Sequence, residues 1–156
     1  MAAFPLQSVL DLAERRAEGR MQRVRMAHGE WLLARARLVR LEDEAEHYRR
    51  NFQQAVGAGA GGGGLWREGA AHLQELARRR AAGRGAIEQC HALWQAALQD
   101  WREEKRRVDA LRVLKRRHEL QEARRQGRLE AKLHDELAAR AAQLRAAVEG
   151  TQGGSP

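Results

Sequence analysis

The sequence has almost none of the residues that interrupt helices or build strands. Its two prolines are Pro5 and Pro156, so none stands between Leu6 and Ser155. Threonine occurs once, serine twice, and aromatic residues make up 4% of the chain. This scarcity argues against a strand-rich fold. Charged residues make up 32%, and Ala, Arg, Leu and Glu dominate, which is typical of long helices and coiled coils.

Disulfides, secretion signals and membrane spans are also missing. Cys90 is the single cysteine, so no internal disulfide can form, and the chain suits a reducing cytoplasm. The first residues lack the basic flank and apolar core of a secretion signal. No run approaches the roughly 18 apolar residues of a membrane span. We therefore expect a soluble cytoplasmic protein.

Signatures of catalysis or of metal and cofactor binding are absent from the sequence. The glycine run is not followed by the Lys-Ser/Thr pair of a phosphate-binding loop. The six histidines form no dense ligand spacing, although His47 and His72 would lie near each other on outer positions. Cys90 and His91 are neighbours whose side chains diverge by about 100° on a helix. We expect no enzyme activity, no metal, no cofactor and no small-molecule substrate.

A glycine-rich stretch at residues 57–64 divides the chain. Six of its eight residues are glycine, the residue that disfavours a helix interior most after proline. The stretch is predicted to be the bend between two helices, at residues 6–56 and 65–149. Gly150 predicts the end of the second helix, which leaves residues 150–156 as a loose tail.

The first predicted helix carries a seven-residue repeat. Counted from Leu10, thirteen of fourteen core positions are apolar or aromatic, which indicates a coiled coil. The exception is Arg20. The fourteen positions are Leu10, Ala13, Ala17, Arg20, Val24, Ala27, Trp31, Ala34, Leu38, Leu41, Ala45, Tyr48, Phe52 and Ala55.

The second predicted helix repeats the pattern less regularly. Its core positions run in heptads from Trp66 and Gly69 to Val108 and Leu111 and include Glu104. Beyond Leu111 the apolar register ends, and residues 115–128 carry a net charge of +4. Apolar spacing returns at Leu129, Leu133, Leu137, Ala141, Leu144 and Val148, which suggests that another surface covers this stripe.

These patterns predict an all-α fold, a long antiparallel two-helix coiled-coil hairpin with an unpaired C-terminal helical extension, forming one domain over residues 1–156. Folding at 57–64 pairs residues whose numbers add to about 121. Trp31 then faces Cys90, and Arg20 falls between Trp101 and Glu104. A cation–π contact or an ion pair there would explain both polar residues of the seam.

The net charge of +8 is compatible with nucleic acid, an acidic protein surface or anionic lipid. The basic stretch after Leu111 is either a solvated helix face or a docking face for an acidic protein. Nucleic acid is disfavoured because no aromatic residues interleave. Near the bend, Leu41, Tyr48, Leu73 and Leu76 are either ordinary seam residues or a partner-binding strip. The basic residues are Arg116, Arg117, Arg124, Arg125 and Arg128.

Several sequence blocks, in order over residues 4–142, resemble one protein family. They are Phe4 and Leu6 with Val9-Leu10-x-Leu12-Ala13-Glu14, Tyr48-Arg49-Arg50-Asn51, Trp66, Leu98-Gln-Asp-Trp101-Arg-Glu-Glu-Lys-Arg106, and Asp135-Glu-Leu-Ala-Ala-Arg-Ala-Ala142. With these blocks the chain resembles FliJ, the coiled-coil stalk protein of the flagellar type III export apparatus.

The resemblance implies a non-catalytic stalk, similar to that of rotary ATPases, which links the export ATPase ring and its regulator to the cytoplasmic domain of the export gate. It also implies handling of export chaperones and a location at the inner face of the cell membrane. Leu41, Tyr48 and Leu76 match the gate-binding face of the family. The alternatives are the equivalent stalk of a virulence secretion system, a basic nucleic-acid-binding coiled coil, and a self-associating coiled coil.

Overall fold

The computed structural model describes residues 2–59 and 61–154, and those residues form two helices and no strand. Helix α1 spans Gln7–Gly57 and helix α2 spans Gly63–Gln152. The two helices pack against each other, so the predicted all-α fold of two long helices is confirmed. The chain contains two compact units, Ala13–Arg107 and the combination of Met1–Leu12 with Val108–Pro156.

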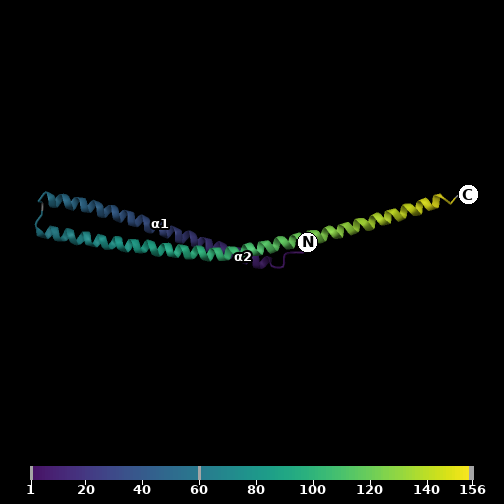
Figure 1. Ribbon diagram of the computed structural model, residues 1–156, viewed down its shortest axis with the longest axis horizontal. Helices are drawn as coiled ribbons and strands as arrows, with labels where there is room; N and C mark the ends of the chain where they lie inside the picture. Colours follow the sequence, from purple (N-terminus) through teal and green to yellow (C-terminus); the bar gives the residue numbers. More distant parts are fainter. Residues whose placement is uncertain (1, 60, 155–156) are drawn as a thin grey trace. The chain divides into compact units, whose positions relative to one another are not determined.

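The unit Ala13–Arg107 is an antiparallel helical hairpin. Its α1 and α2 segments lie side by side and are joined by the glycine-rich bend (Figure 1). At the end of α1, the Ala58 amide donates to the Gln54 carbonyl at 2.9 Å. Gly59 then takes a φ of 69° and Gly61 a φ of 125°, which only glycine adopts readily. The bend therefore depends on glycine at these two positions.

The seven-residue repeat of α1 forms the buried seam. All fourteen predicted positions of α1 are buried or half-buried, among them Val24, Ala34 and Ala45. In α2 the seam prediction is wrong for Trp66, which is 55% exposed. Trp66 stands next to the bend, where Leu65 and the following residues Arg67 and Glu68 are also exposed.

Large side chains of one helix enter gaps left by small residues of the other. The Phe52 ring lies against the Cα of Gly69, and a Cβ on Gly83 would be 3.2 Å from Leu38. Trp31 was expected opposite Cys90, and its ring stacks on Trp94 with centroids 5.1 Å apart. The larger ring surface of Trp94, one turn away from Cys90, is the better partner for an indole.

The unit of residues 2–12 and 108–154 contains the N-terminal segment and the second half of α2. Leu10 and Val108 are both 2% exposed. The seam was expected to end at Leu111, but Lys115, His118 and Glu122 continue the heptad and are half-buried. A ring nitrogen of His118 lies 3.2 Å from the Ala2 carbonyl oxygen, and the Phe4 ring packs on His118 at 5.8 Å. Polar side chains thus extend the pairing by about three turns.

The helix ends differ from the sequence prediction by one to three residues. Helix α2 already begins at Gly63 and ends at Gln152, so the predicted tail at 150–156 starts too early. Gly150 does not take the left-handed conformation of a helix-ending glycine. The Thr151 hydroxyl donates to the carbonyls of Ala147 and Val148 at 2.9 and 2.8 Å, which supports the last turn.

Candidate docking surfaces

The polar pair of the seam lies inside the hairpin. Arg20 Nε is 3.6 Å from Glu104 Oε1, and Arg20 Nη1 is 3.5 Å from Asp100 Oδ2. Arg107 reaches the same Glu104 oxygen at 3.1 Å. Glu104 is 3% exposed, and its Oε2 is buried without a hydrogen-bond partner. A carboxylate held between two guanidinium groups fixes the register of the helices and is not available to a partner.

The three residues assigned to gate binding differ in exposure. Leu41 and Tyr48 are half-buried, whereas Leu76 is 0% exposed. The Tyr48 ring makes an edge contact with His72, with centroids 4.3 Å apart. Because the Leu76 side chain has no exposed surface, it cannot touch a partner directly. It can only pack under the residues that do. Gate binding by these residues remains a prediction.

Sequence reasoning missed a set of exposed apolar side chains beside the bend. Val56 at the end of α1 and Leu65 and Trp66 at the start of α2 are 48%, 52% and 55% exposed. Large apolar side chains clustered in sequence around a turn are typical of an interaction site. The sequence could have indicated this exposure, because Trp66 directly follows the bend and the facing helix α1 ends at Gly57.

A small charged cluster lies on α1 beside Tyr48. The Arg49 guanidinium donates to Glu46 at 2.9 Å, and Arg50 Nε donates to the same carboxylate at 3.2 Å. The hydrogen bond from Arg49, with a further contribution from Arg50, lowers the pKa of Glu46 below its ordinary value. Both arginines are exposed, so they present positive charge at the surface while Glu46 holds their side chains in place.

The five predicted basic residues of α2 are all exposed. Arg117, Arg124 and Arg128 are spaced by seven and four residues, which places them on one helix face. The half-buried residues Lys115, His118 and Glu122 mark the opposite face. Arg116 and Arg125 lie at the edges of the basic face, and Arg125 Nη1 is 3.9 Å from Glu122.

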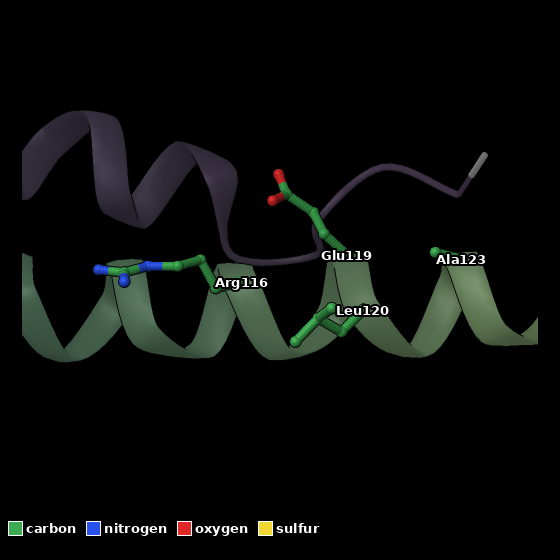
Figure 2. Close-up of a pocket in the computed structure, with 4 residues that line it drawn as sticks. All are labelled: Arg116, Glu119, Leu120 and Ala123. Atoms are coloured by element: carbon green, nitrogen blue, oxygen red, sulfur yellow. The ribbon is translucent and has the colours of Figure 1, made fainter.

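One apolar side chain stands within this basic face. Leu120 is 59% exposed and falls three residues after Arg117 and four before Arg124. It borders a shallow surface hollow of about 510 Å³ that is also lined by Arg116, Glu119 and Ala123. Figure 2 shows Glu119 rising toward the N-terminal segment, whereas Leu120 points away from it. The Leu120 side of α2 is therefore open and apolar at its centre, with Arg117 and Arg124 on one flank and Arg116 and Glu119 on the other.

Residues 127–154 are exposed on every side. The apolar stripe predicted there lies on the surface of α2. Within residues 2–59 and 61–154, no group of three or more potential metal ligands is found. No helix in that part of the chain is long and apolar enough to cross a bilayer. The exposed fractions of the stripe residues are 52% for Leu129, 59% for Leu133, 61% for Leu137, 68% for Leu144 and 57% for Val148.

One comparison with known proteins identifies a family. A family model described as the flagellar FliJ protein matches residues 1–147 of the 156-residue chain. No curated protein and no solved structure matches the chain.

Proposed function

The chain belongs to the flagellar FliJ family, and on that premise we propose that it links the flagellar export ATPase ring to the export gate and handles export chaperones. The family is one of non-enzymatic structural and escort proteins of flagellar export. Membership in a flagellar family favours the flagellar apparatus over the equivalent virulence apparatus.

The observation that carries the ATPase contact is the open face of α2 centred on Leu120. Arg117 and Arg124 lie three residues before and four residues after an exposed leucine, Arg128 follows one turn later, and Leu120 points away from the N-terminal segment (Figure 2). An interface of this composition has an apolar anchor and a charged rim that selects an acidic partner surface. We assign this face to the ATPase ring, with Arg116 and Arg125 at its edges.

The gate contact is assigned to the bend end of the hairpin. Leu41 and Tyr48 are half-buried there, and Val56, Leu65 and Trp66 are more exposed. Tryptophan and tyrosine provide much of the binding energy in protein interfaces. We therefore expect Trp66 to contribute more to gate binding than Leu76, which is fully buried.

Chaperone handling and location at the inner face of the cell membrane rest on family membership. In this proposal the chain is held there through the ATPase and the gate. A basic nucleic-acid-binding protein is the competing class, and the exposed basic face contains no aromatic residue on which a base would stack.

Charge reversal tests the ATPase contact. The triple variant R117E/R124E/R128E is compared with R23E/R37E/R40E, which has the same net charge but changes exposed arginines of α1. We expect the first variant to lose stimulation of the purified export ATPase and capture by it, while the second keeps both. Circular dichroism confirms that each variant retains its helix content.

The gate contact is tested separately with Trp66→Ala and a pull-down by the purified cytoplasmic domain of the gate. We expect at least about a tenfold weaker complex, as for loss of an interface tryptophan. Equal ATPase stimulation by both triple variants, or gate binding unchanged by Trp66→Ala, would contradict the corresponding assignment.

A further inference from the structure

From Leu133 to Val148, the apolar residues of the exposed stripe of α2 are spaced by four, four, three and four residues. Leu133 and Leu144 are eleven residues apart, as are Leu137 and Val148. An eleven-residue repeat corresponds to about 3.67 residues per turn, whereas the seam repeats every seven residues. Two helices that share the eleven-residue repeat pack nearly straight or with a right-handed supercoil, so the natural partner of this stripe is another helix with the same repeat.

We propose that residues 129–148 pair in antiparallel orientation with the same residues of a second copy of this chain. Such a pair has a twofold axis near residues 138 and 139. Leu129 then faces Val148 of the second copy, and Leu133 faces Leu144 of the second copy. Leu137 packs beside Ala141 next to the axis, so each large apolar residue of the stripe has an apolar partner.

The charges around the stripe are complementary to themselves in this arrangement. Glu136 and Arg140 lie on one flank of the stripe, and Glu130 and Arg145 lie on the other. The twofold axis brings Glu136 opposite Arg140 of the second copy and Glu130 opposite Arg145 of the second copy. Because the twofold axis repeats each pair, four Glu–Arg ion pairs border the apolar strip.

The size of the stripe sets the strength of the pair. Five large apolar residues per copy, each between 52% and 68% exposed, become covered. This interface is smaller than those of permanent dimers, so we expect a micromolar dissociation constant and a monomer–dimer equilibrium. The pairing occupies residues beyond Arg128, so it does not depend on the ATPase assignment of the basic face.

Sedimentation equilibrium of the full chain at increasing concentration tests the pairing. The wild-type protein is expected to move from monomer to dimer mass. The variant L133E/L144E places four carboxylates in the dimer strip and should raise the dissociation constant at least about 100-fold, given the loss of four buried leucines. The matched control A131E/A142E adds the same charges at the same spacing on the opposite face and should dimerise like wild type.

A charge exchange tests the ion pairs. Arg140→Glu alone sets glutamates against glutamates on one flank and is expected to weaken the dimer about tenfold. Adding Glu136→Arg in the same chain restores opposite charges across the axis and should return the dissociation constant to near the wild-type value.

Disulfide formation tests the orientation in a Cys90→Ala background. The pair L133C/L144C should cross-link two copies under mild oxidation, while L133C alone should not, because its thiols lie far apart in an antiparallel dimer. The proposal is overturned by a monomer at every concentration, by equal weakening in L133E/L144E and A131E/A142E, by no rescue in the charge exchange, or by efficient cross-linking of L133C alone.

Discussion

The ion pair inside the seam makes an asymmetric prediction about stability. Replacing Arg20 by methionine leaves the Glu104 carboxylate buried, at 3% exposure. Of the two arginines described beside this carboxylate, Arg107 then remains. Replacing Glu104 by leucine leaves Arg20 at 35% side-chain exposure with Asp100 still 3.5 Å away. The arginine keeps contact with water and the carboxylate does not. Arg20→Met should therefore destabilise the hairpin more than Glu104→Leu.

The distances give the size of the effect. At 3.6 Å and an effective dielectric constant of about 20, the Arg20–Glu104 attraction is about 4 to 5 kcal/mol before desolvation. The partial exposure of Arg20 and the cost of removing both groups from water reduce this to a net coupling of about 1 to 2 kcal/mol. We expect Arg20→Met to cost about 2 to 3 kcal/mol and Glu104→Leu at most about 1 kcal/mol. The double variant should lie within about 1 kcal/mol of wild type, since well-packed apolar pairs replace buried ion pairs at little cost.

Urea unfolding followed by helical circular dichroism measures all four proteins of this double-mutant cycle. Arg23→Met is the control, because Arg23 is exposed on the same helix and should change the free energy of unfolding by less than about 0.5 kcal/mol. If both single variants lowered the free energy of unfolding equally, the asymmetry would be refuted. If their effects were additive in the double variant, the coupling between Arg20 and Glu104 would be refuted as well.

Two further predictions concern seam packing and pH. Gly69→Ala should destabilise by about 1 to 3 kcal/mol, because the new methyl group collides with the Phe52 ring, whereas Gly85→Ala has open space and should stabilise by up to about 1 kcal/mol in thermal unfolding. The Arg49 contact lowers the pKa of Glu46, so its stabilising effect is fully present above the ordinary glutamate pKa and is lost as the pH falls through the lowered value. Urea titrations should therefore show wild type more stable than Glu46→Gln at neutral pH and the two converging in acid.

The hairpin could be predicted because its signals are local and repetitive. Glycine at 57–64 stops both helices, and a seven-residue repeat leaves one face of each helix to be covered. Antiparallel folding then assigns partners by arithmetic. The sum of about 121 also pairs Phe52 with Gly69 and Leu38 with Gly83, and the structure brings the members of each pair into contact. Trp31, which was expected opposite Cys90, stacks on Trp94 one turn away.

Other features depend on contacts that an apolar pattern does not contain. Lys115, His118 and Glu122 occupy seam positions without being apolar, and the N-terminal segment covers them through the His118 contacts with Ala2 and Phe4. Long polar side chains can pack their stems and keep their charges near water, so charge alone does not end a seam.

Of the candidate site, the exposure of Arg116, Arg117, Arg124 and Arg128 followed from their position outside the heptad, whereas Arg125 is exposed although it occupies the heptad position after His118. The burial of Leu76 and the exposure of Trp66 did not, because the sequence assigns both residues to the seam. The two residues differ in their distance from the bend. Leu76 has layers of the seam on both sides, whereas Trp66 lies in the last layer before the bend. A heptad assignment treats every layer alike and therefore misses such end effects.

The two repeats of α2 divide the helix into one part that is covered by α1 and one part that is exposed. The seven-residue part is stabilised within its own chain, since large side chains such as Phe52 fill its gaps. Residues 127–152 have no such cover, and their helix is supported by good helix formers, chiefly Ala, Leu, Arg and Glu, and by the Thr151 cap. A helix that relied on propensity alone would gain nothing from leucines at 129, 133, 137 and 144, because alanine forms helices equally well and exposes less apolar surface. The stripe is therefore best explained by burial against another helix.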